Sequence, residues 1–225
     1  MKKRFLALLL VLTLLVGLMP AALAADTVDV SALPEYTAGA DTSAGAAYKI
    51  STEESLRAFA AAVKADDGNG TYAHAGVTLY LAGDIALTGT WKPVGNGVSA
   101  FKDFFSGTFD GCGHTISGLN VQSSTANQGL FAAINQAAIR NLNVSGTVSS
   151  TVNYVGGIVG SSNGGKIENC VNRGNVSGTY KVGGVVGENW GGTVKKCGNE
   201  GLRCGRCFFQ SSAREEKRTG RLLYQ

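Results

Sequence analysis

The chain has 225 residues, of which 44% are hydrophobic and 16% are charged, and it contains 32 Gly but only 3 Pro. This apolar content excludes a wholly disordered chain, and glycines without a three-residue period exclude collagen. The net charge of +4 comes from the two ends of the chain, so the central part has no basic excess that would attract nucleic acid. We therefore expect a folded domain without a nucleic-acid partner.

Residues 1–25 have the three parts of a secretory signal peptide. Lys2-Lys3-Arg4 form a positive start, an apolar run follows, and Ala22-Leu23-Ala24 match the small-x-small cleavage pattern. The apolar run is shorter than the ~20 residues that a membrane-spanning helix needs, which disfavours an uncleaved anchor. These features predict export, a secreted or cell-surface location and no membrane span in the mature protein.

Residues 26–47 are rich in small and polar residues without a hydrophobic period, so we expect a flexible lead-in. A helix is predicted next, because Ser51-Thr52-Glu53-Glu54 match a capping box and apolar residues then recur at helical spacing through Lys64. From Gly76 the hydrophobic period becomes two, which is typical of short strands. We assign residues 48–105 to this capping helix and to the strands that open the domain.

An internal repeat with a constant offset runs through the second half of the chain. Residues 154–160 recur as residues 181–187, and residues 164–170 recur as residues 191–197. Short apolar runs at a fixed period, separated by Gly-rich corners, indicate a solenoid, because one copy is too small to bury its own apolar side. We predict an all-β, right-handed parallel β-helix with one N-terminal α-helix covering its first edge; a β-sandwich is the alternative.

Two looser copies precede these, one over residues 129–144 and one over residues 116–121, whose apolar residues match those of 139–144. Stacking the four copies predicts two columns of inward-facing side chains. The first column holds Ile116, Ile139, Ile167 and Val194, and the second holds Leu119, Leu142, Cys170 and Cys197. Asn172 and Asn199 also fall at equivalent positions, so we expect an amide ladder between their coils.

Three of the repeated segments resemble the GLUG motif of bacterial secreted and surface proteins. They are Gly129-Leu130-Phe131-Ala132, Gly157-Ile158-Val159-Gly160 and Gly184-Val185-Val186-Gly187. The run from Phe105 to Ile116 looks like the lead-in that precedes such repeats, although Ala132 replaces a Gly, and Ile158 and Val185 replace Leu. The resemblance implies β-helix coils over residues 106–201 and an adhesin-like surface module that binds a glycan or a surface protein.

Residues 202–225 break the pattern, because they are rich in Arg and contain no recognisable strand. We expect a frameshifted or disordered basic tail after residue 201, and hence a fragment of a longer repeat array. The pair Cys204 and Cys207 forms a lone C-x-x-C without further ligands at a spacing that suits zinc. We therefore expect no metal there.

Cys170 and Cys197 occupy one predicted column in successive coils. Stacked residues lie about 4.8 Å apart, which is within the range that a disulfide spans. Export would permit oxidation, but parallel side chains suit the torsion of the bond poorly. A disulfide and a pair of stacked free thiols both remain open.

No arrangement of residues supports catalysis convincingly. His114 and Asp110, with Ser106 or Ser117, suggest a dyad or triad, but Asp110 in its Gly-rich run fits a turn that binds backbone amides. Tyr154 and Trp190, or Trp91, fall at turn positions where an aromatic ring can stack on a sugar; a ring that only covers the local packing is the more frequent alternative. We expect a monomeric, non-enzymatic module without cofactors, and a fragment of a carbohydrate-active β-helix enzyme or of a surface peptidase bearing such repeats is the alternative.

Overall fold

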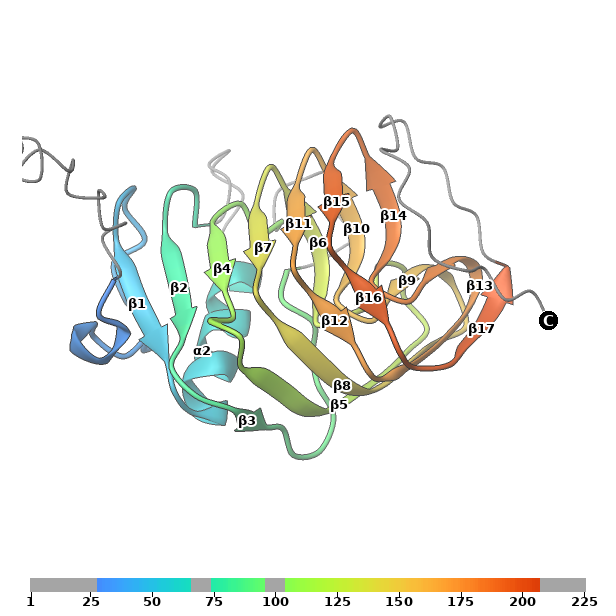
Figure 1. Cartoon of the computed structure of the whole chain (residues 1–225), viewed down its shortest axis with the longest axis horizontal. Coiled ribbons are helices and arrows are strands. Elements are labelled where there is room, and N and C mark those ends of the chain that lie inside the picture. Colours follow the sequence, from blue (N-terminus) through green and yellow to red (C-terminus); the bar gives the residue numbers. More distant parts are fainter. Residues whose placement is uncertain (1–27, 66–73, 96–103, 207–225) are drawn as a thin grey trace, which may run out of the picture.

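A computed structural model of the protein describes residues 28–65, 74–95 and 104–206 and shows a parallel β-helix (Figure 1). All strand pairs in these ranges are parallel. Strands from successive turns of the chain stack into three sheets, and the strands of the six-stranded sheet mark about five turns. Parallel pairing excludes a sandwich of hairpins, in which neighbouring strands are antiparallel.

The three sheets are named A, B and C. Sheet A consists of β1 (Ala47–Ile50), β2 (Thr78–Leu81), β4 (Thr108–Asp110), β7 (Ala138–Arg140), β11 (Lys166–Glu168) and β15 (Thr193–Lys195). Sheet B consists of β3 (Ile85–Ala86), β5 (Thr115–Ser123), β8 (Asn143–Ser150), β9 (Asn153–Gly156), β12 (Val171–Asn172), β13 (Asn175–Gly183), β16 (Gly198–Asn199) and β17 (Arg203–Arg206). Sheet C consists of β6 (Phe131–Asn135), β10 (Val159–Asn163) and β14 (Val186–Trp190).

Sheet A holds one continuous column of inward-facing side chains. Its members are Tyr48, Leu79, Phe109, Ile139, Ile167 and Val194. The four central members are fully buried, whereas Val194 in the last turn is 41% exposed. The first predicted column is therefore correct for Ile139, Ile167 and Val194.

The prediction for the remaining member of that column, Ile116, is wrong. This residue lies in sheet B, where it pairs with Ile85 and Val144, and Phe109 occupies the position expected for it. The predicted placement of Leu119 at the start of the second column is wrong as well. Leu119 pairs with Gly146, next to a register shift between β5 and β8.

Both errors come from aligning two copies at an offset of 23 residues, which is shorter than the offset in either sheet: 30 between Phe109 and Ile139, and 28 between Ile116 and Val144. Asp110 at the end of β4 pairs with Arg140, and Thr115 at the start of β5 pairs with Asn143. The chain between these two pairs is therefore longer by two residues in the coil of Asp110 than in the next coil, and the extra length lies in the turn at Gly111–Gly113. This insertion changes the offset from 30 in sheet A to 28 in sheet B, so no single offset aligns these two coils.

The helix α2 (Glu53–Ala65) joins β1 to β2 and takes the place of sheets B and C in the first turn. It lies behind β2 and β4 in Figure 1. The ring centre of Phe59 lies 5.3 Å from that of Phe105, 6.1 Å from that of Phe109 and 6.5 Å from that of Phe131. The apolar face of α2 thus fills the N-terminal end of the interior; its buried members are Leu56, Phe59, Ala60 and Val63.

The helix begins one residue later than the capping box predicted. Thr52 Oγ1 accepts a hydrogen bond from the Ser55 amide (3.1 Å), and Ser55 Oγ accepts one from the Thr52 amide (3.2 Å). The Ser51 hydroxyl and amide instead donate to the Glu35 carboxylate. The expected pair of Ser51 and Glu54 is wrong because two candidate pairs with the same spacing overlap here.

Parts of both flanking segments join the solenoid. In the expected lead-in, after η1 (Val30–Ala32), the Tyr36 amide donates to the Lys49 carbonyl (2.9 Å) and the Tyr36 ring is buried. In the expected tail, β17 pairs with β13, so the last turn extends to residue 206 and the expectation of no strand after residue 201 is wrong. The predicted signal peptide and Cys207 lie outside the described residues. Within those residues, no helix has the length and apolar character to span a membrane.

Left-handed backbone recurs at equivalent corners of successive coils. The column of Asn127, Tyr154 and Lys181 has φ between 54° and 64°. A second corner column contains Cys112, Asn141, Asn169 and Lys196, with φ between 51° and 54°. Gly was expected at the sharp corners, but all seven positions of these two columns hold other residues, among which Asn tolerates this conformation best. At the third corner, where Gln136, Gly164 and Gly191 are equivalent, two of the three residues are Gly.

Candidate functional site

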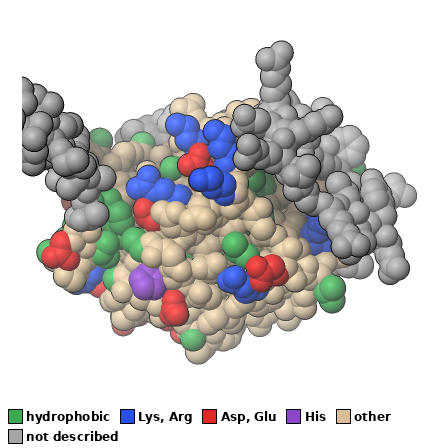
Figure 2. All heavy atoms as spheres, in the orientation of Figure 1, with side chains coloured by type: hydrophobic (Ala, Val, Ile, Leu, Met, Phe, Trp, Pro, Cys, Tyr) green, Lys and Arg blue, Asp and Glu red, His purple; other side chains and the backbone are tan. Residues whose placement is uncertain are grey.

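The outer face of sheet A presents charged side chains in register over four turns. Asp110, Arg140, Glu168 and Lys195 follow one another in paired positions of β4, β7, β11 and β15. Acidic and basic groups therefore alternate along the axis of the solenoid, at the spacing of about 4.8 Å that separates neighbouring strands. Figure 2 shows basic and acidic side chains gathered on this side of the molecule.

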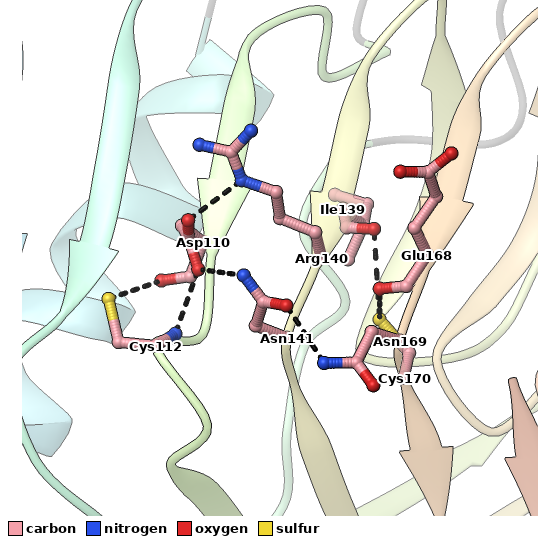
Figure 3. A network of polar contacts seen from close by, with 8 residues as sticks. All are labelled: Asp110, Cys112, Ile139, Arg140, Asn141, Glu168, Asn169 and Cys170. Carbon is pink, nitrogen blue, oxygen red and sulfur yellow. Dashed lines mark hydrogen bonds and ion pairs between the residues drawn. The ribbon is translucent and has the colours of Figure 1, made fainter. Parts of the chain in front are cut away.

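Asp110 is the centre of a polar network at one end of this column (Figure 3). Its Oδ2 accepts a hydrogen bond from Arg140 Nε (2.7 Å), and its Oδ1 accepts from Asn141 Nδ2 and from the Cys112 amide, both at 2.9 Å. Burial acts to raise the pKa of Asp110, but these hydrogen bonds and the Arg140 charge outweigh it and hold the pKa below its ordinary value. The prediction that Asp110 binds a turn amide is confirmed.

The network continues along the corner between sheets A and B. Asn169 Nδ2 donates to Asn141 Oδ1 (2.9 Å), so the two left-handed corner residues form an amide ladder across neighbouring coils. Asn143, at the start of β8, donates to the Gly113 carbonyl (2.9 Å) and accepts from Arg173 Nη1 (3.0 Å). These bonds fix the edge of the face on which the charged column lies.

A shallow hollow lies over the later turns of this face. Among the described residues, no ion pair within 4.0 Å involves Lys166, Glu168 or Lys195, whereas Arg140 is paired with Asp110. The side chains of Lys166, Glu168 and Lys195 are exposed, so the hollow offers hydrated charges of both signs. Its lining consists of Ala138, Arg140, Lys166, Glu168, Thr193 and Lys195.

Cys170 and Cys197 lie in successive coils as free thiols. The Gly198 amide donates to the Cys170 carbonyl (3.0 Å), which places the two cysteines one above the other. The hydrogen bond from the Cys170 thiol lowers the pKa of Cys197 to about 7, and the same contact with burial raises the pKa of Cys170. The predicted stacking of the two cysteines in successive coils is confirmed.

Two glycines of the repeat motif lie against buried or partly buried asparagine side chains. A Cβ on Gly157 would lie 2.4 Å from the Asn172 side chain, and one on Gly184 would lie 2.2 Å from the Asn199 side chain. Asn172 Nδ2 donates to Asn199 Oδ1 (2.9 Å) and to the Gly174 carbonyl (2.8 Å). The predicted ladder of Asn172 and Asn199 is confirmed, and it occupies the space that the absent side chains leave.

The other motif residues serve packing. A Cβ on Gly129, Gly160 or Gly187 would lie within 3.0 Å of backbone atoms in a neighbouring coil. The apolar members Leu130, Phe131, Ile158 and Val159 are fully buried, and Val185 and Val186 of the last turn are partly buried. In this structure the motif builds the interior and contributes no side chain to the charged face.

The residues considered for catalysis do not come together. His114 Nδ1 lies 3.4 Å from Asp84, while the Asp110 carboxylate is engaged by Arg140 and the turn. The hydroxyls of Ser106 and Ser117 donate to backbone carbonyls. Within the described ranges, no group of three or more His, Cys, Asp or Glu side chains is placed to hold a metal ion.

Comparison with known proteins gives a partial likeness. Halomucin from Haloquadratum walsbyi is 36% identical to the chain over 96 residues, which are 42% of this chain. The chain spans about 1% of the length of Halomucin. No protein-family model matches the chain, and no solved structure matches it.

Proposed function

We propose that the chain is an exported, non-enzymatic surface module that binds a glycan or protein partner on the outer face of sheet A. The signal-peptide pattern, the GLUG-like segments and the partial likeness to Halomucin, whose name denotes a mucin, support a role outside the cell. Solenoids commonly bind partners on extended faces, because every coil adds equivalent positions to the same surface. An adhesin-like role follows from these features together.

The hollow with its unpaired charges carries the proposal. Lys166, Glu168 and Lys195 are exposed and make no ion pair among the described residues, so they are available to an external partner. Lys166 and Glu168 lie on β11, which pairs with β7 and β15, and Lys195 lies on β15, which pairs with β11. This pairing holds the charges at a fixed spacing before a partner binds. A fixed pattern of both signs selects a partner with complementary charges and speeds its association.

The test measures binding of the mature full chain to a glycan microarray and to immobilised extracellular proteins. Lys166→Glu reverses one charge in the hollow, and we expect it to weaken binding, most strongly at low salt, because salt screens exposed charges. Lys92→Glu is the control. Lys92 is exposed and lies two residues before Val94, which forms a bridge with Phe131 of sheet C, so the same charge change there should leave binding unchanged. Equal binding by all three proteins would contradict the proposal.

A second measurement separates binding from turnover. The chain is incubated with neutral and acidic polysaccharides while reducing ends and unsaturated products are followed. We expect no release, because Asp110, the buried carboxylate of this face, is engaged by three protein donors. Release by the wild-type chain that is lost in a folded Asp110→Asn variant would show that the module is an enzyme.

A further inference from the structure

Three aromatic rings from sheets B and C surround Lys181. Lys181 Nζ lies 5.0 Å from the ring centre of Tyr154 and 5.6 Å from those of Tyr180 and Trp190. The ammonium group also donates to the Glu188 carboxylate. We call these five residues the aromatic cluster.

Two rings of the cluster are more exposed than the ion pair that they cover. Trp190 is 61% exposed and Tyr180 is 36% exposed, whereas the side chains of Lys181 and Glu188 are 15% and 13% exposed. Trp and Tyr are enriched among the residues that contribute most to binding, so exposed rings gathered at one place are a candidate binding surface. The cluster therefore presents an aromatic surface above a covered ion pair.

The backbone positions of the cluster are fixed without a ligand. Tyr154 and Lys181 are left-handed corner residues of neighbouring coils, with φ of 64° and 54°. The residues that follow them, Val155 and Val182, pair between β9 and β13. Trp190 ends β14, which pairs with β10. A surface held in place by paired strands loses little conformational freedom on binding.

The charge within the cluster is already balanced. The ammonium group of Lys181 donates to the Glu188 carboxylate, and this hydrogen bond raises the pKa of Lys181. Because each charge is neutralised by the other, the cluster has no unpaired cation for an anionic ligand. An uncharged ligand suits it best.

Hydrogen-bonding groups lie beside the indole. Asn163 of β10 pairs with Trp190 of β14, and Asn163 Nδ2 donates to Asn135 Oδ1 (2.8 Å). A carboxamide has two donor hydrogens and an acceptor oxygen, so Asn163 has capacity for further hydrogen bonds. Indole next to a carboxamide matches a pyranose ring, which has one face of C–H groups and a rim of hydroxyls.

We propose that the aromatic cluster is a binding site for a neutral glycan. The C–H face of a pyranose ring packs on Trp190, and its hydroxyls bond to the Asn163 carboxamide. An aliphatic peptide fits less well, because the described surface here is a ring platform flanked by amides. This inference rests on the proposed interaction function and names a ligand class and a second surface for it.

The two tryptophans of the chain make the site directly observable. Trp91 is 3% exposed and its indole donates to the Leu130 carbonyl (3.0 Å), whereas Trp190 is 61% exposed. Neutral hexose and N-acetylhexosamine oligosaccharides should shift the emission of Trp190 and protect it from the quencher acrylamide. An unchanged emission with every neutral oligosaccharide, together with an array free of neutral ligands, would overturn the proposal.

Variants on a microarray of neutral and acidic glycans provide the second readout. Trp190→Ala should lower affinity for the bound neutral glycans about tenfold or more, as loss of a central aromatic anchor does. Leu202→Ala removes another exposed apolar side chain, 76% exposed and outside the cluster, and should have no effect. Neutral-glycan binding that survives in a folded Trp190→Ala chain would contradict the proposal.

Glu188→Gln tests the balance of charge. The substitution leaves Lys181 without its carboxylate partner, so binding should shift from neutral towards acidic glycans; an unchanged preference would contradict the argument. The two proposals fail separately. Binding lost in Lys166→Glu but kept in Trp190→Ala supports the sheet A face alone, and the reverse pattern supports the aromatic cluster alone.

Discussion

The first and last turns of the solenoid are filled by different kinds of side chain. In the first turns, a longer stretch of chain separates paired residues such as Thr78 and Thr108. A helix and aromatic rings, including that of Phe59, occupy the interior there. In the last turns, where that stretch is shorter, Gly184 lies against the Asn199 amide. The longer coils surround aromatic rings, and the shorter coils surround aliphatic side chains such as Ile158 and Ile167 together with hydrogen-bonded amides.

This difference shows that coil length and interior are coupled. Apolar rings are packed by contact with many neighbours, so the first turns depend on volume. Buried amides depend on hydrogen bonds and on the absence of side chains opposite them. Because each coil contacts chiefly its neighbours, substitutions at one end should act mainly on that end.

The largest expected effect is at the helical end. Phe59→Ala removes a fully buried ring that contacts Phe105, Phe109 and Phe131, and we expect a loss of about 3–5 kcal/mol in the free energy of unfolding. Urea unfolding followed by Trp91 emission in a Trp190→Phe background measures it. Glu54→Ala changes an exposed residue of the same helix and should cost far less.

The same end should be sensitive to acid. His74 is buried beside Phe59 and Phe105, its Nε2 lies 2.9 Å from the Tyr36 hydroxyl, and burial lowers its pKa from 6.5 to about 4. A lowered pKa means that the unfolded chain binds the proton first, so stability is complete above pH 6.5 and falls between pH 6.5 and 4, by up to roughly 3 kcal/mol.

Chemical unfolding at a series of pH values checks this slope. His74→Phe cannot take up a proton, so its stability should change little between pH 6.5 and 5. A slope equal to that of the wild-type chain would show that other groups cause the acid sensitivity.

At the amide-filled end, Gly157→Ala should destabilise by about 1–3 kcal/mol, because its Cβ would lie 2.4 Å from the Asn172 amide. Hydrogen exchange should show faster opening of the last turns and little change near α2. Gly83 has open space around it and no left-handed backbone, so Gly83→Ala is the matched control and should be neutral or slightly stabilising.

The smallest effect concerns the inner ladder itself. A double-mutant cycle of Asn172→Ala and Asn199→Ala measures the coupling between the two amides, which we expect to be about 1 kcal/mol. Thermal or urea unfolding of the four proteins gives this number. A coupling near zero would show that each amide acts only through its own turn contact.

The amide-filled end was the more predictable from sequence. Its coils are nearly equal in length, so the constant offset of the repeat predicted the pairs of Ile167 with Val194 and of Asn172 with Asn199. The helical end defeated the same reasoning, because α2 replaces two sheets in one turn and the turn at Gly111–Gly113 changes the offset within a single coil.

The two surface features differ in how far the sequence predicts them. Arg140, Glu168 and Lys195 each directly follow a predicted inward residue of one column, so their common outward face was available from the pattern. The aromatic cluster was not, because Tyr180 and Trp190 have no aromatic counterparts in earlier coils. Their meeting depends on a corner whose bend only the fold reveals.

The turn at Gly111–Gly113 has a practical consequence. The chain accommodates extra length there, while the strands on either side keep their pairing with the next coil. Cys112 and Gly113 are exposed, so additional sequence at this point would project into solvent. Short peptides grafted between them should be displayed beside the charged face, which makes this corner a suitable attachment point for a reporter or an affinity handle.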